Sequence, residues 1–181
     1  MRYSRTVCLK DGRKCIIRNA EESDAGDMLR LFLKTHSETD FLLFYPDECT
    51  FTAEEERSYL KSKADSSMEI ELCAVIDGHI AGCAGIDSIG DKEKIRHRAD
   101  FGISIEKEFW NLGIGSTMLE CALDIARKAG YKQLELEAVS SNDAAVALYK
   151  KAGFMEYGRN PMGFRSRYSG WQEVVLMRLV L

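Results

Sequence analysis

The feature that most constrains the fold is an uninterrupted run of strand, glycine loop, helix and strand in the second half of the chain. Residues 98–105, RADFGISI, have the composition of a buried strand, and residues 132–139, KQLELEAV, predict another. Between them, apolar side chains recur at helical spacing over residues 115–129. Such a βαβ crossover places its two strands side by side and parallel.

The rest of the chain predicts antiparallel strands and further helices. The dipeptides Asp11-Gly12 and Asp77-Gly78 each separate two short strand patterns, as in a hairpin, and Thr52 and Glu55 form a capping box at a helix start. Because hairpins must be antiparallel, the sheet is expected to be mixed. The expected elements are strands at residues 7–9, 14–18, 71–76, 79–86 and 172–181, and helices at residues 23–35, 52–63 and from residue 142 to Gly153.

The composition is that of one globular domain spanning residues 1–181, with 45% hydrophobic and 30% charged residues. The formal net charge of -4 gives no basic field for nucleic acid, and no apolar stretch is long enough to span a bilayer. The six cysteines lack metal-ligand spacing, so they indicate reduced thiols and no metal is expected. Because the N-terminus carries no apolar leader segment, we expect a cytoplasmic protein.

The loop NLGIGSTM, residues 111–118, has the glycine spacing of a phosphate-binding loop. It is not a P-loop, because Ser116 stands where that motif needs a lysine. A dinucleotide-binding loop is disfavoured because Met118 is too bulky for the third glycine position. A pyrophosphate cradle remains, since Gly113 and Gly115 let the backbone approach an anion at a helix N-terminus. The alternative is that the two glycines only form a tight turn between strand and helix.

Two motifs in register resemble the GNAT superfamily of acetyl-CoA-dependent N-acetyltransferases. Gly113 and Gly115 match the family's glycine pattern, although Trp110 stands where the family has Arg or Gln. Residues 136–154, LEAVSSNDAAVALYKKAGF, resemble the family's next strand, helix and Gly-Phe ending. The matching residues of that segment are Asn142, Ala145, Leu148, Tyr149, Gly153 and Phe154. The resemblance covers nearly the whole chain.

The resemblance implies an α/β fold with helices on both faces of a mixed central sheet of about six to seven strands. In that family the two parallel central strands splay apart, and the pantetheine arm of the cofactor inserts between them like an added strand. Three segments are therefore implied to hold acetyl-CoA. Their residues are Ile103, Ser104, Ile105, Leu112, Gly113, Ile114, Gly115, Ser116, Thr117 and Asn142.

Tyr149 and Glu137 are the catalytic residues that the resemblance implies. The phenol of Tyr149 is expected beside the thiol as a general acid; helical spacing alone would make it a core ring with its hydroxyl at the rim. Glu137 occupies the strand position at which some family members place a glutamate base, while Glu135, Asp100 and water stay open as alternatives. Asn142 caps its helix or contacts the cofactor arm.

The predicted function is transfer of the acetyl group of acetyl-CoA to a primary amine by direct attack. A protein N-terminus, a polyamine or another small amine is the expected acceptor, and a homodimer is one possible assembly. Residues 37–48 and 159–173 are expected to build the acceptor site, where Asp40, Asp47 and Glu48 could attract a cationic amine. The alternative function is a non-catalytic regulatory module of the same fold that binds acetyl-CoA.

Overall fold

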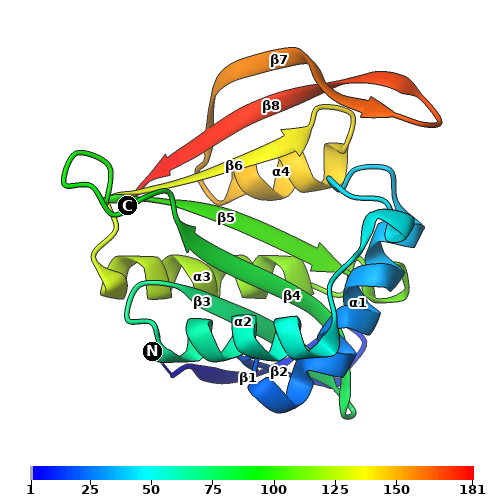
Figure 1. Cartoon of the computed structure of the whole chain (residues 1–181), viewed down its shortest axis with the longest axis vertical. Helices are drawn as coiled ribbons and strands as arrows, with labels where there is room; N and C mark the ends of the chain where they lie inside the picture. Colours follow the sequence, from blue (N-terminus) through cyan, green and yellow to red (C-terminus); the bar gives the residue numbers. More distant parts are fainter. Residues whose placement is uncertain (1) are drawn as a thin grey trace.

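The computed structural model describes residues 2–181, which contain one mixed eight-stranded sheet (Figure 1). The strand order across the sheet is β1-β2-β3-β4-β5-β6-β8-β7. Among these strands, only the β5–β6 pair is parallel. The strands are β1 Ser4–Cys8, β2 Lys14–Asn19, β3 Ile70–Ile76, β4 His79–Ser88, β5 Arg98–Ile105, β6 Gln133–Val139, β7 Met155–Ser166 and β8 Gly170–Val180.

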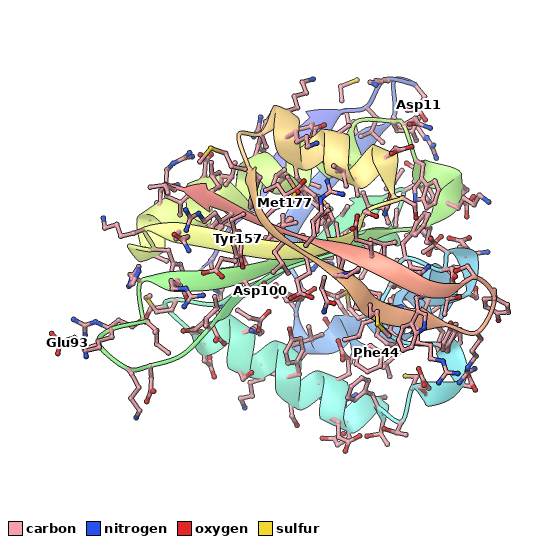
Figure 2. The ribbon with its side chains drawn as sticks, turned by 90° about the horizontal axis from the view of Figure 1, so that it is seen from above. Asp11, Phe44, Glu93, Asp100, Tyr157 and Met177 are labelled. Atoms are coloured by element: carbon pink, nitrogen blue, oxygen red, sulfur yellow. The ribbon has the colours of Figure 1, made fainter. Side chains whose placement is uncertain are left out.

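Two helices cover each face of the sheet (Figures 1 and 2). Helices α1 and α2 pack on one face and enclose a small core with β3 and β4, whereas α3 and α4 enclose the larger core on the other face. The helices are α1 Ala25–Glu38, α2 Ala53–Asp65, α3 Ile114–Ala129 and α4 Asp143–Lys151, with short 3-10 turns η1 Glu22–Asp24, η2 Pro46–Glu48 and η3 Lys107–Phe109.

The parallel strands stay paired only over a short stretch. β5 and β6 pair from Arg98 with Gln133 to Asp100 with Glu135, although β5 continues to Ile105. Beyond that point β5 keeps its pairing with β4, and β6 keeps its pairing with β8. The two strands therefore splay apart, which confirms the expectation drawn from the family resemblance.

Side-chain alternation assigns the residues of β5 to the two faces. Ala99 and Phe101 belong to the core beneath α3 and α4, so Asp100 points to the opposite face, toward α1 and α2. Figure 2 shows Asp100 on that side of the sheet and Met177 of β8 on the α4 side. The acidic side chain of β5 is therefore on the α1 and α2 face of the sheet, and its apolar side chains are on the α3 and α4 face.

The expected elements are present, with small differences in extent. The sheet has eight strands rather than about six to seven, because residues 155–166, which were not expected to form a strand, pair with β8 as strand β7. The capping box at Thr52 is confirmed, since its hydroxyl accepts a hydrogen bond from the Glu55 amide and the Glu55 carboxylate accepts one from the Thr52 amide. Within residues 2–181, every helix is too short or too polar to cross a membrane.

Candidate active site

A cavity of about 910 Å³ lies at the opening between β5 and β6. Both strands contribute to its walls, together with the glycine loop before α3, the exposed side of α4 and the loop after α1. Phe164 of β7 also lines it. The opening in the parallel ladder therefore joins space on both faces of the sheet.

The glycine loop presents backbone amides at the start of α3. Asn111 and Gly113 both adopt positive φ, 64° and 95°, which bends the chain sharply into the helix. The first helical hydrogen bond of this turn runs from the Thr117 amide to the Gly113 carbonyl, at 3.1 Å. The amides of residues 113–116 precede it, so they have no partner inside the helix and carry its partial positive charge.

Two residues of the expected cradle have other roles. The amide of Thr117 is used inside the helix, and its hydroxyl also donates to the Gly113 carbonyl, at 3.1 Å. The Leu112 carbonyl accepts a hydrogen bond from the Lys10 amide, at 3.2 Å, and neither Leu112 nor Thr117 lines the cavity. The residues that combine an unpaired helix-start amide with a place in the cavity wall are therefore Gly113, Ile114, Gly115 and Ser116.

Trp110 fixes the end of β5 to the start of the glycine loop. Its indole N–H donates to the carbonyl of Ile105 at 2.7 Å, and its ring lines the cavity. The Ile105 carbonyl thus has a partner within the chain. Ser104 lies in a hydrogen-bonded pair with Cys83 of β4, because the Glu106 amide bonds to β4 two residues further on. The backbone groups of β5 left open at the cavity are therefore those of Ile103 and the amide of Ile105. The side chain that replaces the family's Arg or Gln has a structural contact of its own.

Tyr149 of α4 lies in the cavity wall and is only 6% exposed. Its ring meets Phe101 edge-on at 6.4 Å between centroids and Phe154 at 5.9 Å. Burial and the negative charge of Asp100 raise the pKa of Tyr149 to about 12. The phenol therefore keeps its proton at neutral pH and is available as a hydrogen-bond donor.

Asp100 and Glu137 lie on the same face of the sheet, and both line the cavity. Burial raises the pKa of Asp100 to about 6, and the negative charges of Asp87 and Glu137 add to the shift. Glu135 is different, because Arg98 holds its carboxylate with an Nη2–Oε2 distance of 2.8 Å. That ion pair outweighs burial and lowers the pKa of Glu135, so this residue is committed to structure.

Asn142 and Lys151 mark the two ends of α4 at the cavity. The Asn142 side chain accepts a hydrogen bond from the Ala145 amide at 3.3 Å, which is the N-cap expected from the sequence. Lys151 lines the cavity as well, and Lys150 does not. Asn142 therefore combines its capping role with a place in the cavity wall.

The acids of the loop after α1 are tied to the β7–β8 hairpin. Asp40 accepts hydrogen bonds from Ser166 Oγ at 2.6 Å and Gln172 Nε2 at 3.1 Å. Asp47 forms an ion pair with Arg167 at 2.7 Å. These two carboxylates therefore brace the loop against the hairpin, a role that the sequence did not predict.

The same loop supplies apolar residues to the cavity that the sequence analysis did not assign. Phe41, Leu42 and Leu43 line it, opposite the acids of the sheet. The run FLLF, residues 41–44, could have predicted this contact from the sequence, because apolar side chains in a polar loop are expected to pack against another surface. The loop is therefore a roof over the cavity, held by Asp40 and Asp47.

An opening between two parallel strands, with unpaired helix amides at one end, suits an extended cofactor that carries a pyrophosphate. That combination defines the class of acyl-CoA-dependent transferases. The chain belongs to the acetyltransferase (GNAT) family, because its residues 29–154 match the model of that family. The family's donor is acetyl-CoA. Residues 2–181 contain no group of three or more His, Cys, Asp or Glu side chains arranged to hold a metal ion.

Similar proteins support this assignment. The L-amino acid N-acetyltransferase AaaT of Escherichia coli (strain K12) is 31% identical over 46% of this chain and 52% of its own length. The ribosomal protein bS18-alanine N-acetyltransferase of the same strain is 39% identical over 31% of this chain and 38% of its own length. The chain thus spans about half or less of these curated relatives. The crystal structure of a GNAT-family acetyltransferase from Streptococcus pneumoniae is 34% identical, with a TM-score of 0.88 over 92% of this chain and 99% of that one.

Proposed function

We propose that this chain transfers the acetyl group of acetyl-CoA to a primary amine by direct attack of the amine on the thioester. The supporting observation is the single cavity that joins the amides before α3 to Asp100 and Glu137 across the splayed strands. One end suits the cofactor's phosphates, and the other suits a cationic amine. Because the two meet at the opening, both substrates would be bound within reach of each other.

The chain's own residues fit acetyl-CoA, which supplies the activated acetyl group when it is bound. The amides of Gly113, Ile114, Gly115 and Ser116 would hold the pyrophosphate. The backbone of Ile103 and the amide of Ile105, which face the opening, would hold the pantetheine amides. The capped N-terminus of α4 at Asn142 would face the cofactor arm.

Glu137 is the proposed base. A lysine-like amine has a pKa of about 10.4, so most of its molecules are protonated at neutral pH and must lose a proton before they attack. Glu137 lies in the cavity wall on the face away from α3 and α4, where it can accept that proton directly or through water. As the new N–C bond forms, the C–S bond breaks and its electron pair leaves with sulfur.

Tyr149 is the proposed donor to the departing sulfur. Its pKa of about 12 lies above that of a thiol, about 8.5, so complete transfer of its proton to a thiolate is uphill. A hydrogen bond from the phenol still stabilises the negative charge on sulfur in the transition state. Starting from the ammonium form, the nitrogen loses two protons. The first leaves before attack, through Glu137 to solvent, and the second, lost as the amide forms, balances the proton that the thiol gains.

The relatives suggest two kinds of acceptor, a protein N-terminal alanine and a free amino acid. Release of free thiol from acetyl-CoA, measured across a panel of small amines and short peptides, tests the proposed activity. We expect at least one primary amine to raise thiol release well above the rate in its absence. Tight binding of CoA with no such increase for any amine would instead favour a non-catalytic acetyl-CoA-binding module.

A further inference from the structure

The charges of the cavity differ between its two ends. Its basic lining residues are Lys10, whose amide bonds to the glycine loop, and Lys151 at the end of α4. Its acidic lining residues are Asp100 and Glu137, which project from the opposite face of the sheet. The cofactor end is therefore basic, and the acceptor end is acidic.

The cations nearest to the acidic end are already paired. Arg98, two residues before Asp100, holds Glu135. Lys63 of α2 is 4% exposed at its side chain and contacts Asp87 and Glu69. Neither offers a free positive charge to a ligand beside Asp100.

One further arginine lies behind the apolar roof. Arg165 lines a separate cavity of about 210 Å³, which shares Leu42, Leu43 and Phe164 with the main one. Its guanidinium stacks on Trp171, with 5.5 Å between the guanidinium carbon and the ring centroid. Since these shared apolar side chains stand between the two cavities, Arg165 is not a lining residue at the acidic end.

The surroundings of Asp100 and Glu137 strengthen their effect on a ligand. Phe41, Leu42 and Phe164 line the same cavity, and apolar walls weaken the screening that water gives. Negative neighbours and burial already disfavour the charged form of Asp100, which raises its pKa. An ammonium group entering this end would relieve the repulsion between these carboxylates, whereas a carboxylate on the ligand would increase it.

We propose that the acceptor is a primary amine whose adjacent carbon carries no carboxylate, and that free α-amino acids are excluded. This inference rests on the proposed function and chooses between the two acceptor types that the relatives suggest. In an α-amino acid the carboxylate is one carbon from the reacting nitrogen, so it must enter beside Asp100 and Glu137. An alkyl amine, an amino acid amide or a peptide N-terminus brings only the cation.

Alanine and alaninamide are the matched pair that tests this proposal, because they differ only in carboxylate against amide. Thiol release from acetyl-CoA is measured for both, and kcat/KM is compared per neutral amine. We expect alaninamide to be favoured by about tenfold or more, since like charges brought together in a poorly screened site repel strongly. Equal or faster acetylation of alanine would overturn the proposal while leaving the acetyltransferase function intact.

Two variants locate the source of the selectivity. Asp100→Asn should reduce the preference for alaninamide at least about threefold, because one of the two repelling charges is removed. Asp91→Asn removes an acid of the β4–β5 loop that lies outside the cavity and is 85% exposed at its side chain, so it should leave the preference unchanged. An unchanged preference in Asp100→Asn would contradict the assigned role of this carboxylate.

Equilibrium binding gives a readout that does not depend on turnover. Calorimetry with the CoA-loaded protein should show tighter binding of alaninamide than of alanine by a similar factor. Equal affinities would contradict the inference, whereas the expected preference without any thiol release would contradict only the proposed catalysis. A dipeptide amide and putrescine, compared in the same assays, show whether a peptide N-terminus or an alkyl amine is the better acceptor.

Discussion

Asp100 and Glu137 project from neighbouring strands into one cavity, just where the parallel ladder between those strands ends. Asp100 forms the last pair of that ladder with Glu135, and Glu137 follows two residues later on the same face. In the proposed function, the opening that would admit the cofactor also brings these two acids to the amine. Glu135, the partner of Asp100 in that last pair, is neutralised by Arg98 instead.

The pH dependence of the reaction should report Asp100. Its pKa is about 6, so the carboxylate is charged above that pH and loses its attraction for an ammonium group below it. The ratio of wild-type to Asp100→Asn kcat/KM should be constant above about pH 7 and fall toward unity below about pH 5. Taking the ratio cancels the titration of the amine itself. A ratio that does not change over this range would show that Asp100 does not titrate in the free enzyme.

Tyr149→Phe should lower kcat by about 10- to 100-fold, because the hydrogen bond to the leaving sulfur is lost. KM for acetyl-CoA should change by less than about twofold, since the ring and its contacts with Phe101 and Phe154 remain. Tyr131→Phe is the matched control, because Tyr131 is also buried but lies outside the cavity. Normal kcat in Tyr149→Phe would remove this residue from the mechanism.

Gly115→Ala should weaken cofactor binding without disturbing the fold. A Cβ at this position would lie 3.4 Å from Leu148 Cδ2 and 3.5 Å from Ile105 Cδ1, which are ordinary contacts. The added methyl group would nevertheless occupy the cradle, so we expect KM for acetyl-CoA to rise about tenfold while Tm changes by only a few degrees. Gly26→Ala on the exposed side of α1, where a Cβ meets nothing within 4 Å, is the control for a neutral substitution. An unaltered KM in Gly115→Ala would argue that the loop is only a turn.

Trp110→Phe tests the hydrogen bond from Trp110, the residue that stands where the family has Arg or Gln. Loss of the indole donor leaves the Ile105 carbonyl without its partner, and one such hydrogen bond is worth about 1 kcal/mol. We expect KM for acetyl-CoA to rise about three- to tenfold and kcat to stay within about twofold, because β5 and the glycine loop are held less firmly. Trp171→Phe on the β7–β8 hairpin should change neither constant. Equal behaviour of the two variants would show that the Trp110 contact does not position the cofactor.

Local patterns were sufficient to predict the elements that surround the site. Helical spacing, the Thr52 capping box and the Asn142 cap depend on residues at most a few positions apart, and all three appear in the structure. Contacts between distant residues were not predictable in this way. Asp40 meets Ser166 across 126 positions, so nothing near Asp40 in the sequence indicated that its carboxylate would be used in bracing the loop.

The choice among candidate acids needed three-dimensional information for the same reason. Period-two alternation placed Glu135 and Glu137 on one face but could not distinguish them. The distinction comes from Arg98, which register places opposite Gln133, two pairs before Glu135. Trp110 is a similar case, because its role depends on the turn Lys107–Phe109 that carries its indole back to Ile105.

The buried Glu106 at the end of β5 should make the protein sensitive to loss of Arg30. Glu106 is 1% exposed, and its partners are Arg30 Nη1 at 2.5 Å and His79 Nε2 at 3.0 Å. Burial alone would raise the pKa of Glu106, but the hydrogen bonds from Arg30 and His79 outweigh it and lower the pKa. Arg30→Ala would leave a buried carboxylate with a single partner, so the free energy of unfolding should fall by about 3 kcal/mol.

The depressed pKa of Glu106 also fixes the pH range in which this contribution acts. It is fully present above the unfolded value of about 4.3 and is lost as the pH falls through the lower folded value. The difference in unfolding free energy between wild type and Arg30→Ala, measured with urea, should therefore be largest near neutral pH and shrink in acid. Arg57→Ala, which breaks an exposed pair with Glu54, should cost less than about 0.5 kcal/mol at any pH. Equal destabilisation by the two variants would mean that Glu106 is not held as a charged group in the folded protein.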